Sequence, residues 1–357
     1  PRSTLFPYTT LFRSTMKKQY ATLKDVAALA GTTAATVSYV LNESDNRYIS
    51  SAMRSKVLEA AKELNYIKCS GASSLRGKKR KIIAVLVPQF ENQFFTRIVL
   101  AVEQVFDKHG YILSICNTFD EPERERDIIK RMQQQRVDGY VLTPTREGAA
   151  NTAQLRKMGV PIVVVDRPLD GLKDYFWVTT RNYRCGYVAA EYLINKGHSH
   201  IAFIGWDSRI QDLVDRETAF FDAGKAYGIP RENFVAINGG FTKEEGYRMT
   251  QEVLRDHPGV SAILYGYNIQ AKGGIQCLTE RGVAIPEDMS VVIIGSPEWV
   301  SAGRNNFTHV DQGDYELGCK AANLLLEVIN GDGKVPGRHI IQECTLVEGD
   351  TVYAIHG

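Results

Sequence analysis

Long apolar segments are absent from this chain of 357 residues. The apolar run from Ile82 to Val87 stops at Pro88, whereas a helix that crosses a bilayer needs about 20 apolar residues. The first 15 residues also lack the continuous apolar stretch and the small-residue cleavage site of a secretory signal. We therefore expect a cytoplasmic protein that makes no contact with a membrane.

Paired cysteines are absent as well, because none of the six cysteines belongs to a C-x-x-C motif. This usage favours reduced thiols over a disulfide framework or a zinc site. His198 and His200 have a spacing that would place two metal ligands on one face of a strand, but no further ligand lies near them in the sequence. We expect these histidines to be structural, and we predict neither a metal nor a cofactor.

Three common enzyme motifs are missing. No G-x-G-x-x-G opens a helix after the first predicted strand, no G-x-x-x-x-G-K-[ST] is present, and no G-x-S-x-G nucleophile elbow appears. Dehydrogenase, P-loop and α/β-hydrolase chemistry therefore have no support. We predict no catalytic residue, and an enzyme is kept only as a remote alternative.

Net charge is small, at +2, but it is unevenly distributed. Residues 17–81 carry +8, residues 1–15 carry +2 and residues 82–357 carry −8. A basic segment attached to an acidic body is typical of a nucleic-acid-binding module joined to a domain of another function. Chance variation of charge between domains is the alternative.

The basic segment has the pattern of three short helices. Thr22 predicts the capped start of the first helix and Gly31 its end. Thr33 caps a second helix, and a third starts near Ser50. Three helices with a glycine turn between the first two describe a helix-turn-helix unit. The residues expected to face its small core are Val26, Leu29, Ala30, Val37, Val40, Leu41, Val57, Leu58, Ala61 and Leu64.

From residue 82 onward, predicted strands and helices alternate. Apolar β-branched runs such as 82–87 and 161–165 are typical of buried parallel strands, and stretches such as 94–109 and 122–134 are typical of helices. The alternation predicts an α/β fold with two lobes of doubly wound parallel sheets. A ligand cleft is expected outside the carboxyl ends of the strands.

Two segments of this chain resemble the DNA-binding head of the LacI/GalR family of bacterial repressors. They are TLKDVAALAGTTAATVSYVLN and YISSAMRSKVLEAAKELNY. The family's effector-binding core, which is related to periplasmic sugar-binding proteins, resembles RVDGYVL, VPIVVVDR and FTHVDQGDYELGCKAANLLLE. The resemblance covers residue 16 to about residue 348. The family positions met in the head are Thr22, Asp25, Val26, Ala27, Ala30, Gly31, Thr36, Val37, Ser38, Leu41 and Asn42.

The resemblance implies a division of the chain into segments. Residues 1–15 resemble translated cloning sequence, so we expect them to be a non-native leader, with a native extension as the alternative. The expected segments that follow are the helix-turn-helix head (16–66), the hinge (67–81), and a core (82–357) with lobe 1 at about 82–181 and 299–330 and lobe 2 at about 182–298 and 331–357.

The second helix of the head would enter the major groove. The resemblance places Ala34, Ala35 and Tyr39 opposite base edges, although an alanine contacts only a thymine methyl group, and helix propensity explains the alanines equally well. The positions that hold phosphates in the family are Thr22, Thr33, Ser38, Asn42, Ser50 and Tyr66, and each is alternatively a cap or a surface residue.

In the hinge, Leu75 matches the leucine that opens a minor-groove step in the family. The resemblance also implies that Arg76 lies near the phosphates. Lys68 replaces the family's usual proline, and Gly71 lies inside the expected hinge helix. A flexible basic linker is the alternative reading when DNA is absent.

In the cleft, the resemblance assigns a ligand contact to Arg216, whose guanidinium suits hydroxyls or carboxylates. An ion pair with Asp212 or Asp215 is the structural alternative. Pro297 stands where the family usually has a ligand aspartate, so the effector is not named beyond a sugar or nucleoside-like metabolite. The effector-binding residues that we predict, some of which are alternatively core, are Phe94, Phe95, Arg216, Phe241, Asn268 and Glu298.

Together these features predict a transcriptional repressor whose affinity for operator DNA is controlled by a small molecule bound between two lobes. The expected partners are double-stranded operator DNA, the small-molecule effector and a second copy in a homodimer, because no heptad tail for a larger assembly is seen. The alternative is a small-molecule (sugar) binding protein without DNA function, against which the complete head argues.

Overall fold

The computed structural model describes residues 20–42, 48–67, 79–145, 148–169, 171–172, 174–207, 211–296, 298–300, 306–331 and 336–355. The chain divides into two compact units, residues 1–79 and 80–357, which are described separately below. The expected leader, most of the hinge and Pro297 lie outside the described residues.

The first unit contains the three expected helices, α1 (Leu23–Ala30), α2 (Ala34–Leu41) and α3 (Ser51–Glu63). A capping box starts α1, in which Thr22 Oγ1 accepts from the N–H of Asp25 and the Asp25 carboxylate accepts from the N–H of Thr22. Gly31 ends α1 at φ +65°, a left-handed conformation that glycine adopts without strain.

The small core of the first unit differs from the expected set at two positions. Val26, Val37 and Val57 are fully or almost fully buried, as expected, but Leu29 and Leu58 are 47% and 50% exposed. The inward direction predicted for these two leucines is therefore wrong. The buried residues are Val26, Ala27 and Ala30 on α1 and Val57 and Ala60 on α3, so that each helix buries positions three or four residues apart along one face.

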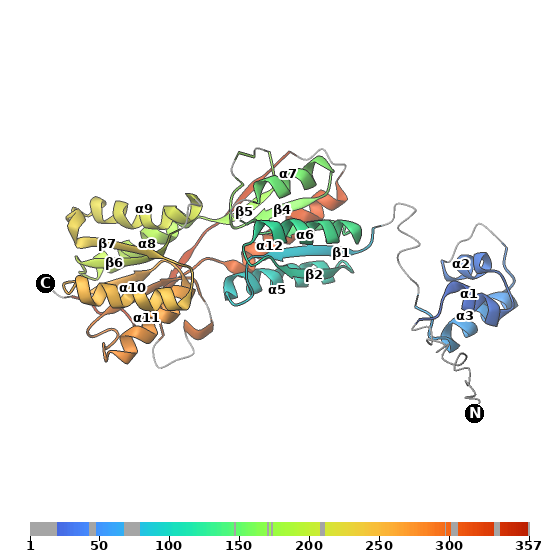
Figure 1. Ribbon diagram of the computed structural model, residues 1–357, viewed down its shortest axis with the longest axis horizontal. Helices are drawn as coiled ribbons and strands as arrows, with labels where there is room; N and C mark the ends of the chain where they lie inside the picture. Colours follow the sequence, from blue (N-terminus) through green and yellow to red (C-terminus); the bar gives the residue numbers. More distant parts are fainter. Residues whose placement is uncertain are drawn as a thin grey trace, which may run out of the picture. The chain divides into compact units, whose positions relative to one another are not determined.

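The second unit contains two sheets, each covered by helices on both faces (Figure 1). Every strand pair of the first sheet is parallel. In the described residues its strand order is β11 (His339–Gln342), β5 (Trp177–Thr180), β4 (Ile162–Val165), β3 (Gly139–Leu142), β1 (Ile82–Val87) and β2 (Ile112–Asn117). Its helices are α5 (Gln93–Asp107), α6 (Pro122–Gln134), α7 (Ala149–Lys157) and α12 (Asp314–Asn330).

The second sheet is parallel except for its antiparallel edge pair, β10 with β12. Its described order is β12 (Thr345–Val347), β10 (Thr308–Asp311), β9 (Ser290–Ile294), β8 (Ala262–Tyr265), β6 (Ile201–Trp206) and β7 (Phe234–Gly239). Its helices are α8 (Asn182–Asn195), α9 (Gln211–Ala226), α10 (Lys243–Asp256) and α11 (Asn268–Glu280), with short 3₁₀ turns at Arg231–Asn233 and Glu298–Val300.

Four apolar clusters fill the interfaces between these sheets and helices. In lobe 1, α5 and α12 cover one sheet face and α6 and α7 cover the other. In lobe 2, α8 and α9 pack on one face and α10 and α11 on the opposite face. Strands such as β1 are buried on both sides, which explains their continuous apolar sequence. The α/β architecture that the sequence predicts is thereby confirmed.

The boundaries of the lobes differ from the expected ones near the end of the chain. We expected residues 299–330 in lobe 1, but β10 pairs with β9 and so belongs to the sheet of lobe 2. We expected residues 331–357 in lobe 2, but β11 pairs with β5 in lobe 1. The chain thus crosses between the lobes after β5, after β10 and after β11, because each late strand extends a sheet built from earlier segments.

None of the helices that the structure describes is long and apolar enough to span a membrane.

His198 fastens the end of the described chain to lobe 2. Its Nε2 lies 3.0 Å from the carbonyl oxygen of Tyr353, to which it donates, and its Nδ1 lies 2.8 Å from Ser261 Oγ. The imidazole is buried, and burial lowers its pKa although the Tyr353 bond opposes this effect. The structural role expected for His198 is consistent with these contacts.

We expect the stability of the protein to fall as the pH drops below about 6.5, the ordinary pKa of histidine. The unfolded chain then binds a proton that the buried imidazole of His198 resists until its lower folded pKa is reached. The free energy of unfolding in urea, measured between pH 7.5 and 5, should therefore depend less on pH in His198→Gln. His200→Gln, at an exposed neighbour, is the control, and an equal slope for both variants would contradict the assignment.

Candidate functional site

Three of the polar residues predicted to hold phosphates in the head, Thr22, Thr33 and Ser50, lie at the start of a helix. Thr33 Oγ1 accepts from the N–H of Thr36 at 3.2 Å, and Ser50 Oγ accepts from the N–H of Met53 at 3.3 Å. With Thr22 they cap the three helices of the head. These hydroxyls therefore have a structural role, and they also lie beside N–H groups that favour an anion.

One side of α2 and its C-terminal end carry the other predicted contacts. Ala35 and Asn42 are exposed, whereas Ala34, Ser38 and Tyr39 are half-buried. Asn42 Nδ2 donates to the carbonyl oxygen of Ser38 at 2.6 Å and to its hydroxyl at 3.1 Å, so Asn42 also closes the helix. Positions 35 and 39 are four residues apart and share a helix face.

The remaining predicted DNA contacts are Tyr66 in the head and Leu75 and Arg76 in the hinge. Tyr66 is half-buried and packs against the core of the head. Leu75 and Arg76 lie outside the residues that the structure describes.

The second unit has a cavity between its two lobes, at the carboxyl ends of the strands. Five of the predicted effector residues, Phe94, Phe95, Arg216, Phe241 and Asn268, line this cavity. The other lining residues are not among the six predicted effector residues, and they are Asn92, Asp166, Arg167, Trp206, Tyr267, Ile294 and Gln312.

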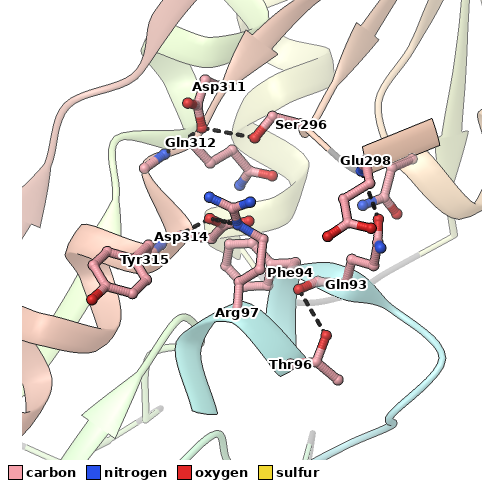
Figure 2. A network of polar contacts seen from close by, with 12 residues as sticks. Gln93, Phe94, Thr96, Arg97, Ser296, Glu298, Asp311, Gln312, Asp314 and Tyr315 are labelled. Atoms are coloured by element: carbon pink, nitrogen blue, oxygen red, sulfur yellow. Dashed lines mark hydrogen bonds and ion pairs between the residues drawn. The ribbon is translucent and has the colours of Figure 1, made fainter. Parts of the chain in front are cut away.

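Glu298 is the predicted effector residue that the structure places outside the cavity lining. It is exposed, and its backbone N–H donates to Gln93 Oε1 at 2.8 Å, as Figure 2 shows. A second contact between the lobes runs from Asn268 Nδ2 to Asn92 Oδ1 at 3.2 Å. These two bonds connect the rims of the cleft directly.

The passage from β10 to α12 is held by a polar network next to the cleft (Figure 2). Asp311 accepts from the hydroxyl of Ser296 and from the N–H of Gly313, both at 2.9 Å. Arg97 forms an ion pair with Asp314 at 2.7 Å. Burial raises the pKa of Asp314, and the bond from Arg97 works against that rise.

Arg216 enters the cavity from α9 and is 3% exposed. Its Nε donates to Asn182 Oδ1 at 2.8 Å, and its Nη1 donates to the carbonyl oxygen of Gly266 at 2.7 Å. The guanidinium also lies 4.7 Å from the ring centroid of Tyr267. These hydrogen-bond partners are uncharged, so the guanidinium is oriented by neutral groups.

Aromatic rings form the wall of the cavity on the lobe 2 side. The centroids of Trp206 and Phe241 are 4.8 Å apart, and Tyr267 meets both rings edge-on at 6.1 Å and 5.2 Å. Burial raises the pKa of Tyr267 to about 12, so its hydroxyl is neutral at physiological pH. Such a wall suits the carbon face of a ring.

Asp166 and Arg167 follow β4 and are the charged residues that sequence reasoning missed. Asp166 has a φ of +69°, which is uncommon for a residue other than glycine and is typical of a constrained site. Their position directly after a predicted parallel strand could have identified them, because ligands bind at the carboxyl ends of such strands. Burial raises the pKa of Asp166, and the charges of Arg167 and Arg216 oppose that rise.

A helix-turn-helix unit followed by a two-lobed core with an interlobe cavity defines a ligand-binding regulator of the kind found in bacteria. Residues 22–68 match the lacI family of bacterial regulatory proteins, and residues 190–352 match a periplasmic binding protein-like domain. Relatives of similar length, described next, agree over most of the chain. The chain belongs to the lacI family of bacterial regulatory proteins.

Two curated relatives and one solved structure illustrate the similarity. The HTH-type transcriptional repressor PurR of Histophilus somni is 30% identical over 317 residues, which is 88% of this chain and 94% of the relative. The ribose operon repressor of Halalkalibacterium halodurans is 28% identical over a match that covers 91% of this chain and 97% of the relative. The solved structure of a LacI family regulator from Silicibacter pomeroyi superposes with a TM-score of 0.78 at 26% identity. The superposition covers 93% of this chain and 99% of that structure.

Gly186 allows α8 to approach α9 closely behind the cavity. A Cβ atom at this position would lie 2.2 Å from the carbonyl oxygen and 2.8 Å from the Cα of Arg216. We expect Gly186→Ala to displace Arg216 and to lower the free energy of unfolding by about 1–3 kcal/mol, as overpacked cores do. Urea unfolding measures the loss. Gly259→Ala, whose nearest neighbour is 4.0 Å away, should be nearly neutral, and equal losses in both variants would refute the argument.

Proposed function

We propose that this chain is a transcriptional repressor that binds operator DNA through its head and is controlled by a small molecule bound in the cleft of its core. The observation that carries the proposal is the presence, in one member of this family, of a helix-turn-helix unit and a cavity lined by both lobes. Its relatives include a repressor named PurR and a ribose operon repressor. A sugar effector agrees with the second of these names, and a nucleoside-like metabolite is the alternative.

In the head, α2 enters the major groove and α1 and α3 support it. Ala34, Ala35 and Tyr39 face the base edges, where the alanines contact thymine methyl groups. Polar side chains of the head contact the DNA phosphates. They are Thr22, Thr33, Ser38, Asn42, Ser50 and Tyr66. The phosphate contacts position the head, whereas the groove-facing residues and DNA shape select the sequence.

The connection between head and core transmits the signal. Residues 67–81 form the hinge, in which Leu75 is wedged into the minor groove and Arg76 contacts a phosphate. An effector that binds one arrangement of the lobes more tightly shifts the population of that arrangement and thereby the affinity for DNA. The bonds Asn92–Asn268 and Gln93–Glu298 contribute to the balance between these arrangements.

A homodimer places two heads on the two halves of a near-palindromic operator. Lobe 1 carries an exposed apolar surface that suits this pairing, because Leu100 is 49% exposed and Ile112, on the edge strand β2, is 66% exposed. Exposed large apolar side chains on a sheet edge favour association.

Mobility shift with genomic DNA fragments at several salt concentrations tests the proposal. We expect a sequence-specific complex whose affinity falls steeply with salt, as counterion release requires, and whose affinity changes when metabolites are added. If no specific complex forms with or without metabolites, the repressor function is wrong. A small-molecule binding protein without DNA function would then be the better description.

We expect Leu75→Ala to weaken specific DNA binding far more than nonspecific binding. The reason is that the wedge is used only where the minor groove opens, whereas phosphate contacts serve both modes. Titration with operator and with random duplex gives the two affinities. Leu58→Ala, at an exposed leucine of α3, is the matched control, and equal losses on both DNAs would rule out the wedge.

A further inference from the structure

Two cysteines that are far apart in the sequence meet in lobe 2. Cys185 lies on α8, and Cys344 lies in the short connection between β11 and β12. Cys344 packs against the apolar cluster that contains Cys185, and the thiol of Cys185 donates a hydrogen bond to the sulfur of Cys344. Both are free thiols in this structure. Neither residue lines the interlobe cavity or belongs to the head, so the proposed function leaves this pair unexplained.

The backbone on either side of the two cysteines is already joined. The N–H of Arg181, the residue before α8, donates to the carbonyl oxygen of Gln342 at 2.9 Å. The side chain of Arg181 also forms an ion pair with Glu343 at 2.6 Å. The first passage between the lobes therefore lies beside the third passage at the point where the thiols meet. A disulfide requires two backbones held close together, and these contacts hold them so.

The two thiols differ in exposure and in acidity. Cys185 is fully buried, and burial together with its hydrogen bond raises its pKa. Cys344 is half-buried. The hydrogen bond from Cys185 lowers the pKa of Cys344 against the opposing effect of burial, and the charge of Arg184 lowers it further. The thiolate is the form that attacks an oxidant, so Cys344 is the attacking thiol and Cys185 the resolving one.

The other cysteines that the structure describes have the opposite tendency. Burial raises the pKa of each of them, and they are Cys116, Cys277 and Cys319. Cys319, on α12, is half-buried like Cys344. It therefore serves below as the matched control for reactivity at similar exposure.

We propose that Cys185 and Cys344 form a reversible disulfide when the protein meets a peroxide, and that this bond ties the first passage between the lobes to the third. Transient disulfides of this kind are the ones found in cytosolic proteins, where they report oxidants. The inference goes beyond the proposed repressor function and does not depend on it, because it concerns the core alone.

The chemistry requires one molecule of hydrogen peroxide. The thiolate of Cys344 attacks one peroxide oxygen, the O–O bond breaks, and hydroxide leaves and takes up the proton that the Cys344 thiol released. The resulting sulfenic acid is then attacked by the sulfur of Cys185. The S–S bond forms, the S–O bond breaks, and the proton of the Cys185 thiol leaves with the hydroxyl group as water. Two thiols are oxidised by two electrons, and the peroxide is reduced to two waters.

The bond changes how the two passages are held together. The ion pair of Arg181 with Glu343 joins two side chains that are about half exposed, and such pairs contribute little because water screens them. A disulfide adds a covalent link at the same place. The oxidised lobes therefore lose freedom to turn about the first and third passages, and the core resists unfolding more strongly.

Peptide mapping of the full chain after treatment with hydrogen peroxide tests the bond itself. Free thiols are blocked with N-ethylmaleimide, the protein is digested without reductant, and the peptides are identified by mass spectrometry. We expect a linked pair of peptides that contain Cys185 and Cys344, and its disappearance after dithiothreitol is added. Cys319→Ser should keep this link, and Cys344→Ser should lose it.

Cys185→Ala separates the attacking thiol from the resolving one. In this variant Cys344 has no partner, so we expect it to accumulate as a sulfenic acid, which dimedone captures. Peroxide treatment that leaves both thiols of the wild-type chain free would overturn the proposal. So would a link from either cysteine only to Cys69 or to a second copy.

Thermal unfolding tests the constraint. We expect the oxidised wild-type chain to melt about 5–10 °C above the reduced chain, because the bond closes a long loop in the unfolded state. Cys319→Ser should show the same rise on oxidation, and neither Cys344→Ser nor Cys185→Ala should show it. A mapped bond with an unchanged or lowered melting temperature would mean that the passages must move apart from their present contact to form it, and would overturn the proposed tie.

Discussion

The cleft exists because the chain passes between its two sheets three times, and the pairing of the late strands imposes these passages. β11 extends the first sheet beside β5, and β12, only two residues further on, extends the second sheet beside β10. Arg181, at the first passage, forms an ion pair with Glu343, at the third. Both side chains are about half exposed, so the strand pairing and not this ion pair provides most of the constraint. Everything that lines the cleft is positioned by this arrangement.

Close packing around the cleft stabilises the fold, whereas buried polar groups without partners lower its stability. Gly186 lets α8 and α9 touch in lobe 2, which fixes the backbone of Arg216, and Asp120 forms an ion pair with Arg167 within lobe 1. Arg167 Nε and Gln312 Nε2 have no acceptor among the residues that the structure describes. A buried donor without an acceptor lowers stability, and both of these residues line the cavity.

The sequence predicted most of the elements and a large part of the site, for identifiable reasons. The helices of the head are marked by local capping residues, and the inner strands by continuous apolar runs, so both could be read without tertiary information. The strands β5, β10, β11 and β12 were not predicted because they are short, and β11 and β12 are also half-exposed edge strands without an apolar run. Asp166 and Arg167 were passed over because their role depends on side chains brought together from both lobes.

The amino-acid sequence alone determined the class of this protein: a basic helix-turn-helix head, an α/β core, and membership in a family whose motifs lie in contiguous segments. Only the tertiary structure decided which lobe receives β10 and β11, that Glu298 lies outside the cavity lining, and that Arg216 is oriented by Asn182 and Gly266. The reason is physical. Caps and hydrophobic periodicity act over a few residues, whereas strand order and the partners of a buried side chain depend on segments that lie far apart in the sequence, 34 and 50 positions for the partners of Arg216.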